Sequence, residues 1–205
     1  MTNKSIIICC PGRTGSHWLG YILRDVLRLN EMDTKDFNAN TFNDGGTITT
    51  VHTFDGLELV EEQANIIMML RDPRDICVSA AFYNANKNNG DFEDNLKNYL
   101  TGGLHNGYFL NGMNGQKYYI VRYEDMVKDP FRAIKDVLDH FQYEYLTSQI
   151  NSCIKNNVFE VHHKRKPVHY RKGVVGDWKN YITPEQNEDY CKKHAGIMKA
   201  FGYDK

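Results

Sequence analysis

Four short runs rich in apolar and β-branched residues are spaced along the chain, and each ends at a polar, proline- or glycine-containing stretch. A run of four to eight such residues is typical of a strand buried inside a sheet. The runs predict strands, in chain order, at residues 6–10, 47–52, 65–70 and 117–122.

Between these runs the apolar residues recur at spacings of three and four, which is the period of an α-helix. The clearest stripe comprises Trp18, Leu19, Ile22, Leu23, Val26 and Leu27. Helices are predicted at residues 16–27, from residue 73, and at 91–100, 130–141, 146–155 and 184–201, the last with Thr183 as N-cap. Polar or glycine-rich stretches at 30–47, 84–90, 101–115 and 171–177 are predicted to be loops, with 101–115 mobile.

Strands that alternate with helices, without internal repeats, predict an α/β fold: a three-layer arrangement with a mostly parallel central sheet and helices on both faces. The length of 205 residues suits one domain spanning residues 1–205. Ligands bind such sheets beyond the carboxyl ends of the strands. Residues 12–16, His52, Arg71 and Tyr123 directly follow predicted strands, so we expect them to converge on one crevice.

The stretch from residue 5 to residue 27 predicts a strand, a tight glycine loop and a helix, which together form a P-loop-like phosphate-binding unit. The first N–H groups of a helix have no internal partner and lie at the positive end of its dipole, so they suit a phosphate. Arg13 adds a forked cation, and Thr14 and Ser16 add hydroxyl donors. The ATP/GTP signature is absent because Ser16 and His17 follow Gly15 where Lys and Ser or Thr are required. On this stretch alone, an ordinary β–α turn stays an alternative.

Composition limits the function classes. A net charge of −1 gives no support for bulk nucleic-acid binding. The local basic run at 161–172 is either a solvated face or an anion site. The five cysteines include no CxxC pair, and two lie in a predicted core strand, which favours a reduced, cytoplasmic protein. Neither a signal peptide nor a membrane span is predicted, and because His162 and His163 lack a well-spaced third ligand, no metal is expected.

Four stretches resemble, in order, the motifs of the sulfotransferases that use 3′-phosphoadenosine 5′-phosphosulfate (PAPS). They are CPGRTGSHWL, RDPRDICVSAAFY, VRYEDMVKDP and RKGVVGDWKNYIT, the last being the longest and most specific. The resemblance covers nearly the whole chain. It implies a sulfotransferase that moves the sulfuryl group of PAPS to a hydroxyl or amine acceptor and leaves adenosine 3′,5′-bisphosphate (PAP).

The resemblance also implies roles for individual residues. The 5′-phosphosulfate end of the donor would be bound by Arg13, Thr14, Gly15, Ser16 and His17. The 3′-phosphate would be bound by Arg71, Ser79, Arg171, Lys172 and Gly173. The adenine would be contacted by Trp18, Tyr123 and Phe159. Each residue taken singly also has an ordinary structural explanation. Aromatic side chains usually lie in the core, and Arg71 could belong to a cluster of ion pairs on the surface.

His52 matches the catalytic histidine of the family, and an imidazole with a near-neutral pKa suits a general base. Two departures concern the charge near the transferred group, because Arg13 and Thr50 each stand where the family usually has lysine. His17 replaces a threonine there and, with Arg13, is a candidate to supply that charge. One alternative is therefore a sulfotransferase-like protein that binds nucleotide without turnover, and a P-loop-type small-molecule kinase is a weaker alternative.

The expected partner is a small-molecule acceptor, with neither nucleic acid nor membrane. Its identity depends on residues 30–46 and 84–115, which are short and poor in aromatic residues, so the sequence does not name it. Residues 179–188 resemble the family's short dimer motif, but Pro184 stands where valine is usual and also suits the start of the last helix. We therefore expect a monomer or a weak homodimer by this route.

Overall fold

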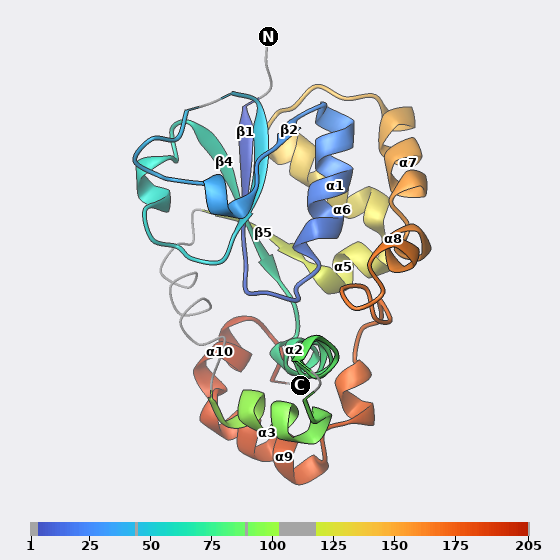
Figure 1. Cartoon of the computed structure of the whole chain (residues 1–205). Helices are drawn as coiled ribbons and strands as arrows, with labels where there is room; N and C mark the ends of the chain where they lie inside the picture. The colour runs from blue at the N-terminus through green and yellow to red at the C-terminus, as the bar shows by residue number, and fades with distance from the viewer. Residues whose placement is uncertain (1–3, 44, 89, 103–117, 205) are drawn as a thin grey trace.

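The computed structural model describes residues 4–43, 45–88, 90–102 and 118–204. Its centre is a sheet of five strands in the order β2-β3-β1-β4-β5 (Figure 1). The strands are β1 (Ser5–Cys9), β2 (Asn30–Glu31), β3 (Thr47–Val51), β4 (Ala64–Leu70) and β5 (Tyr119–Arg122). Every pairing is parallel, so all the carboxyl ends lie at one edge, and β1 occupies the middle of the sheet.

The predicted strands are confirmed, but the sequence missed β2. Its two residues are exposed and carry no apolar pattern, so they lay within the predicted loop at 30–47. They become a strand because Asn30 and Glu31 pair with Thr47 and Ile48 at the edge of the sheet. A 3₁₀-helix, η1 (Thr34–Asp36), follows in the same stretch, so the loop prediction was wrong at its start.

One face of the sheet is covered by helices. They are α1 (Ser16–Leu27), α5 (Tyr123–Lys128), α6 (Pro130–His140) and α7 (Thr147–Asn156) (Figure 1). Ile6, Ile8, Ile67 and Met69 point to this face and form one buried cluster with the apolar stripes of the helices. Alternate residues of a strand point to opposite faces, which is why β1 divides its isoleucines between two cores.

The opposite face is covered by two different groups. Ile7, Cys9 and Ile66 pack against η2 (Leu57–Leu59) and its neighbouring loops. Met68 and Leu70 pack against a second group of helices: α2 (Pro73–Asn88), α3 (Phe92–Gly102), α9 (Pro184–Lys193) and α10 (Ala195–Ala200). That group lies beyond the carboxyl edge of the sheet in Figure 1. The predicted α/β class with a mostly parallel sheet is confirmed, although helices cover only part of this face.

The last predicted helix, 184–201, is wrong as a single element. It begins as expected: the Thr183 hydroxyl accepts from the Gln186 N–H, and the Gln186 side chain accepts from the Thr183 N–H. The backbone then leaves the helical region at His194 (φ −112°), which ends α9 and precedes α10. No proline marks this break, so the periodicity of the sequence did not reveal it.

Three further observations bear on the sequence predictions. Most of the predicted mobile loop at 101–115 lies outside the described residues, and Thr101 and Gly102 belong to the end of α3. The five cysteines are free thiols. Within the described ranges, no helix combines the length and the apolar character that crossing a bilayer requires.

Candidate functional site

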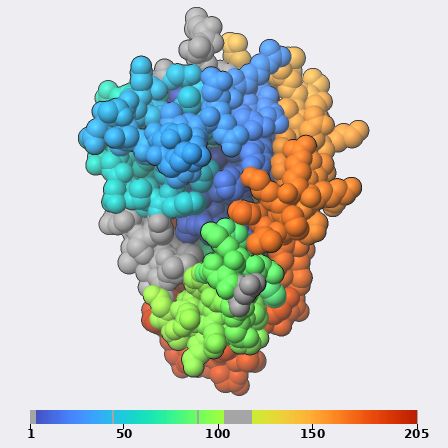
Figure 2. Space-filling view, in the orientation of Figure 1, coloured from blue at the N-terminus to red at the C-terminus, as the bar shows by residue number. Residues whose placement is uncertain are grey.

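A cavity of about 320 Å³ opens at the carboxyl ends of β1, β3 and β4. Its walls come from the loop before α1, from α2, from the start of α5, from α8 (Phe159–Arg165) and from the segment 169–174. The blue, green and orange segments meet around this hollow in the space-filling view (Figure 2). Its lining comprises Gly12, Arg13, Gly15, Ser16, His17, Trp18, His52, Arg71, Ser79, Tyr83, Tyr123, Phe159, His162, His169, Tyr170, Arg171, Lys172, Gly173 and Val174.

The predicted convergence of the strand ends on one crevice is confirmed. Of the residues that the sequence predicts to bind the donor or to act in catalysis, all but Thr14 line the cavity. The Thr14 side chain is buried, and its hydroxyl donates to the Pro11 carbonyl across 3.1 Å. In this structure the hydroxyl therefore closes the loop on itself, and the expected contact of Thr14 with the 5′-phosphosulfate stays a prediction.

The loop before α1 brings backbone N–H groups to the cavity. Gly15 is the N-cap residue of α1, in the left-handed region at φ +90°. A Cβ at this position would lie 2.7 Å from Cδ2 of Tyr123, so only glycine fits between the loop and that ring. The first turn of α1 carries no acidic residue. The positive end of the helix dipole is thus left for an external anion.

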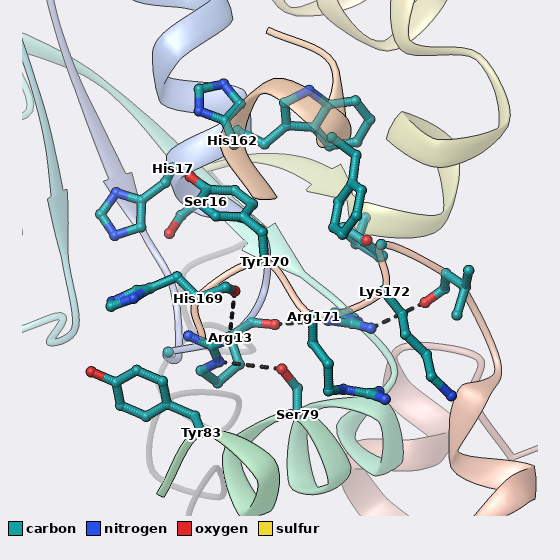
Figure 3. Close-up of a pocket in the computed structure, with 18 of the residues that line it drawn as sticks. Arg13, Ser16, His17, Ser79, Tyr83, His162, His169, Tyr170, Arg171 and Lys172 are labelled. Atoms are coloured by element: carbon teal, nitrogen blue, oxygen red, sulfur yellow. Dashed lines mark hydrogen bonds between the residues drawn. The ribbon is translucent and has the colours of Figure 1, made fainter. Parts of the chain in front are cut away.

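Arg13 lies nearer to α2 than the sequence predicted. Its Nε donates to the Ser79 hydroxyl at 3.2 Å, and its Nη2 donates to the His169 carbonyl at 2.7 Å (Figure 3). Its guanidinium stacks on the Tyr83 ring at 4.7 Å. Arg13 and Ser79 were assigned to opposite ends of a ligand, whereas the structure joins them. Burial lowers the pKa of Arg13, and the neighbouring Arg71 lowers it further.

Arg71 is held in place by backbone carbonyls. Its Nη1 donates to the Arg13 carbonyl at 3.0 Å and its Nη2 to the Val174 carbonyl at 3.2 Å. Its guanidinium lies 4.3 Å from the centre of the Tyr123 ring. Its Nε is also a donor, and it is buried without a hydrogen-bond partner in the described structure. A buried donor of this kind is costly unless something accepts from it.

Arg171 and Lys172 share one carboxylate. Arg171 Nη2 donates to Asp177, and Lys172 Nζ donates to the same side chain at 3.1 Å. Burial opposes ionisation of Asp177, but its bonds from Arg171, Asn180 and Lys172 lower its pKa. Arg171 Nε, like Arg71 Nε, is buried without a partner among the described residues. Both guanidinium groups therefore retain a donor.

Gly173 lets an aromatic wall approach the backbone. It has φ +70°, and a Cβ there would lie 2.6 Å from Cδ2 of Phe159. Phe159 begins α8 and faces the cavity, and Trp18 faces it from α1. The Trp18 Nε1 is buried without a partner in the described ranges. These two rings give the cavity apolar surface beside its cations.

His52 follows β3 and is exposed at the cavity. Its Nδ1 lies 2.8 Å from the Cys10 carbonyl oxygen. A carbonyl only accepts, so Nδ1 carries the hydrogen and Nε2 of the neutral ring carries the lone pair. A hydrogen bond to the Cys10 side chain is the main cause that raises the pKa of His52, the bond to the Cys10 carbonyl adds to it, and partial burial opposes the rise. For His17, burial followed by the charges of His169 and Lys166 lowers the pKa.

The sequence missed several lining residues. Tyr83, His162, His169, Tyr170 and Val174 all face the cavity. Tyr83 lies one helical turn after Ser79, a spacing that was a usable signal. The basic run 161–172 was interpreted as either a solvated face or an anion site. Residues 164–168 are exposed, as a solvated face would be, while the segment from His169 to Lys172 lines the cavity.

His162 is part of an aromatic stack rather than a solvated face. Its ring packs on Tyr21 at 4.8 Å and on Tyr170 at 5.1 Å, and its Nε2 lies 3.1 Å from Asn157 Oδ1. Within the described ranges, no group of three His, Cys, Asp or Glu side chains is placed to hold a metal ion.

A second cavity, of about 430 Å³, adjoins the first and shares His17 with it. Its lining comprises His17, Gly20, Tyr21, Arg24, Glu31, Met32, Asp33, Thr34, Ile48, Thr49, Thr50 and Lys166. Thr50, where the resemblance expected a lysine, borders this cavity, and its carbonyl accepts from the Thr34 hydroxyl at 2.6 Å. Arg24 pairs with Glu31 at 2.8 Å on the wall.

Comparison with known proteins gives a consistent result. The family model described as "Sulfotransferase domain" matches residues 3–202. Sulfotransferase 2A1 of Rattus norvegicus is 27% identical over 169 residues, which cover 70% of this chain and 60% of the relative. A flavonol sulfotransferase-like protein of Flaveria bidentis is 29% identical over 130 residues, 54% of this chain and 40% of the relative. The chain thus spans about three fifths, or less, of the curated relatives' length.

Two solved structures share the fold. Mouse sulfotransferase SULT7A1, complexed with PAP, has a TM-score of 0.77 and 21% identity, covering 95% of this chain and 84% of that one. A retinol dehydratase, in complex with androsterone and inactive cofactor PAP, has a TM-score of 0.71 and 14% identity, covering 95% and 80%.

The close approach of Phe159 to residue 173 is testable with two glycines. Gly173→Ala and Gly176→Ala each place alanine at positive φ (+70° and +76°), but no atom lies within 4 Å of the new Cβ at Gly176. We expect Gly176→Ala to lower the free energy of unfolding by about 1 kcal/mol from backbone strain. Gly173→Ala should cost about 2 kcal/mol more, because the ring must move. Urea denaturation measures both, and equal losses would contradict the proposed contact.

Proposed function

The chain belongs to the sulfotransferase domain family, and we propose that it transfers the sulfuryl group of PAPS to a hydroxyl or amine of a small-molecule acceptor. One observation carries this proposal. The cavity joins a helix N-terminus to two guanidinium groups, Arg71 and Arg171, whose buried Nε donors have no partner in the described structure. That arrangement suits a ligand with two separated anionic groups and an aromatic base.

The donor is proposed to bind across the cavity. Its 5′-phosphosulfate end would accept from the backbone N–H groups at Gly15, Ser16 and His17. Its 3′-phosphate would accept from Ser79 and from guanidinium groups, which bind phosphate through paired N–H donors. Arg13, already bonded to Ser79, would serve the 3′-phosphate as well as the loop.

The adenine is proposed to lie against the aromatic walls. Trp18 and Phe159 present ring surface to the cavity, and Tyr123 closes it beside Gly15. Ring stacking of this kind recognises a base by its flat face. The 3′-phosphate would then lie beside the segment of Arg171, Lys172 and Gly173, as the resemblance implied.

His52 is proposed to be the general base. Its Nε2 would take the proton of the acceptor hydroxyl as that oxygen forms a bond to sulfur. The bond between sulfur and the 5′-phosphate oxygen breaks, and its electron pair stays on that oxygen, which leaves as PAP. Negative charge grows on the leaving oxygen, so cations and N–H groups directed there stabilise the transition state. Arg13 is the cation proposed for this role, since Thr50 brings no charge, and His17, whose pKa is lowered, would contribute a ring N–H.

The acceptor is proposed to enter through the second cavity, which meets the first at His17. Four charged side chains line it: Arg24, Glu31, Asp33 and Lys166. Burying an apolar ring against charged groups removes their water without replacing it, which is unfavourable. The cavity therefore suits a polar acceptor.

A nucleotide-binding protein without turnover is the second candidate, favoured by Thr50 in place of the usual lysine. Incubation with labelled PAPS and a panel of polar acceptors separates the two functions. Transfer of label to an acceptor supports the enzyme. Tight binding of PAP with no transfer, across the whole panel, supports the binding protein.

The choice of nucleotide can be measured directly. We expect calorimetry to show that PAP binds at least about tenfold more tightly than ADP or ATP, because a second phosphate contact to the buried cations is worth about that factor. AMP serves as the control that lacks the 3′-phosphate. Binding of ATP as tight as that of PAP would contradict the proposed donor.

The role of His52 predicts a kinetic and a pH effect. His52→Ala should lower kcat about 10²-fold or more while leaving PAP affinity nearly unchanged. Because hydrogen bonds to Cys10 raise the pKa of His52, the base stays protonated to a higher pH than free histidine. The wild-type rate should therefore increase with pH through a limb centred above about 6.5.

The exposed His140, the last residue of α6, does not line the cavity and provides the matched control. His140→Ala should keep both the rate and the pH limb. Full turnover by His52→Ala would reassign the base, and His17 is then the next candidate.

For assembly and compartment we propose a cytoplasmic monomer or weak homodimer. Two buried, adjacent free thiols, Cys9 and Cys10, support a reducing compartment. Pro184 is the first residue of α9, so the dimer-like segment is used to start a helix. Light scattering over a dilution series should show either a monomer throughout or a dimer that has dissociated before nanomolar concentration is reached. A nanomolar dimer abolished by Lys179→Glu would contradict this expectation.

A further inference from the structure

Asp75, in the first turn of α2, is buried and bonds to the point where a distant loop enters the 3₁₀-helix η3 (Asp177–Asn180). Its Oδ2 accepts from the Gly176 N–H at 2.8 Å, and its Oδ1 accepts from the Trp178 N–H at 2.9 Å. Each carboxylate oxygen thus binds one backbone amide about a hundred residues further along the chain. The carboxylate ties residues 176–178 to the start of α2.

The same loop carries the cavity's anion-binding side chains. Arg171 and Lys172 lie a few residues before the tied amides, and Val174 accepts from Arg71 Nη2 at 3.2 Å. That Nη2 also lies 3.9 Å from Asp75 Oδ2. Arg71 and Asp75 therefore hold the loop from two sides, Arg71 through a carbonyl and Asp75 through two N–H groups.

A carboxylate at this place is not explained by packing alone. Asp75 is 1% exposed, and removing a charge from water is unfavourable unless it is fully compensated. Burial raises the pKa of Asp75, while the charge of Arg71 and the two amides oppose that rise. The N–H groups of Gly176 and Trp178 require two acceptor oxygens, and an apolar residue provides neither.

We propose that Asp75 is a positioning residue for the 3′-phosphate of the donor, acting through the loop at residues 171–178. This inference rests on the proposed function. Asp75 does not touch the ligand. It places the loop so that the guanidinium of Arg171 and the backbone at Gly173 face Arg71 and Ser79 across the cavity.

Asp75 has two opposite effects on phosphate binding, so the inference predicts the direction in which the affinity changes. As a negative charge near Arg71, Asp75 repels a phosphate, so its removal would strengthen phosphate binding. As the tether of the loop, its removal would displace the residues that bind the phosphate and weaken binding. The inference requires the second effect to dominate.

Asp72 provides a matched control in the same turn. It is also buried, but its carboxylate bonds to Arg74, at 3.0 Å to Nε and 2.8 Å to Nη2. Oδ1 of Asp72 also accepts from the Arg74 backbone N–H at 2.9 Å. Asp72→Asn and Asp75→Asn therefore both remove a buried charge, which accepts three hydrogen bonds at Asp72 and two at Asp75. Of the two carboxylates, only Asp75 bonds to the backbone of residues 176–178, whereas Asp72 reaches this segment only through Arg74, whose guanidinium lies 4.0 Å from the centre of the Trp178 ring. Replacement of Asp75 should therefore alter the recognition of the 3′-phosphate, and replacement of Asp72 should not.

The experiment compares calorimetric affinities for adenosine 3′,5′-bisphosphate and adenosine 5′-monophosphate. Asp75→Asn should weaken bisphosphate binding about tenfold and monophosphate binding less than about threefold, because amide geometry satisfies only one of the two N–H donors. Asp72→Asn should keep the wild-type ratio of the two affinities. A ratio that is unchanged or higher in Asp75→Asn overturns the inference.

Asp75→Glu keeps the charge and displaces the carboxylate, so it serves if Asp75→Asn does not fold. Asp75→Glu should also lower the ratio of bisphosphate affinity to monophosphate affinity, and a wild-type ratio in this variant overturns the positioning role. Hydrogen exchange at the Gly176 and Trp178 amides tests the tether without nucleotide. These amides should exchange faster in the Asp75 variants than in Asp72→Asn, and equal rates overturn the tether. Failure of wild-type protein to prefer the bisphosphate over ATP would instead refute the proposed function.

Discussion

Three guanidinium groups around one cavity are the constraint on which the surrounding structure depends. Arg13, Arg71 and Arg171 are close enough that Arg71 and Arg171 both lower the pKa of Arg13, after burial itself. Like charges in a partly buried place are unfavourable unless neighbouring groups compensate them. Much of the local architecture supplies that compensation.

The compensation is of three kinds. Carbonyl oxygens of the loop before α1 and of the segment 169–174 accept from Arg13 and Arg71. Buried carboxylates lie beside Arg71 and Arg171. Aromatic rings of Tyr83, Tyr123 and Phe82 lie under the three cations. Each kind also fixes a position, so the cations are arranged before an anion arrives, and binding then orders fewer side chains.

The recognition of the fold and of most of the site was possible because both depend on local signals. The apolar run before Pro11, the glycine loop and the helical stripe after Ser16 are contiguous in sequence, so their strand–loop–helix geometry follows from short-range preferences. His52, Arg71 and Tyr123 each follow a strand directly, and a parallel sheet brings such positions to one edge. The capping box at Thr183 is equally local.

What the sequence could not provide were the features created by contacts between distant segments. The strand β2 exists only through its pairing with β3, and its residues carry no pattern of their own. The sequence predicts that the Thr14 hydroxyl contacts a phosphate, whereas in the structure this hydroxyl donates to the Pro11 carbonyl. Arg13 joined Ser79 because α2 passes beside the loop.

The sequence by itself determined the strand–loop–helix unit, the order of the elements and the residue types at the strand ends, because backbone preference and hydrophobic period act over a few neighbours. The tertiary structure alone decided which cation faces which acceptor. It joined Arg13 to α2, gave Arg171 and Lys172 a shared partner in Asp177, and set Asp75 against amides about a hundred residues away. Those pairings depend on how segments remote in sequence pack around one cavity, and no local pattern specifies that packing.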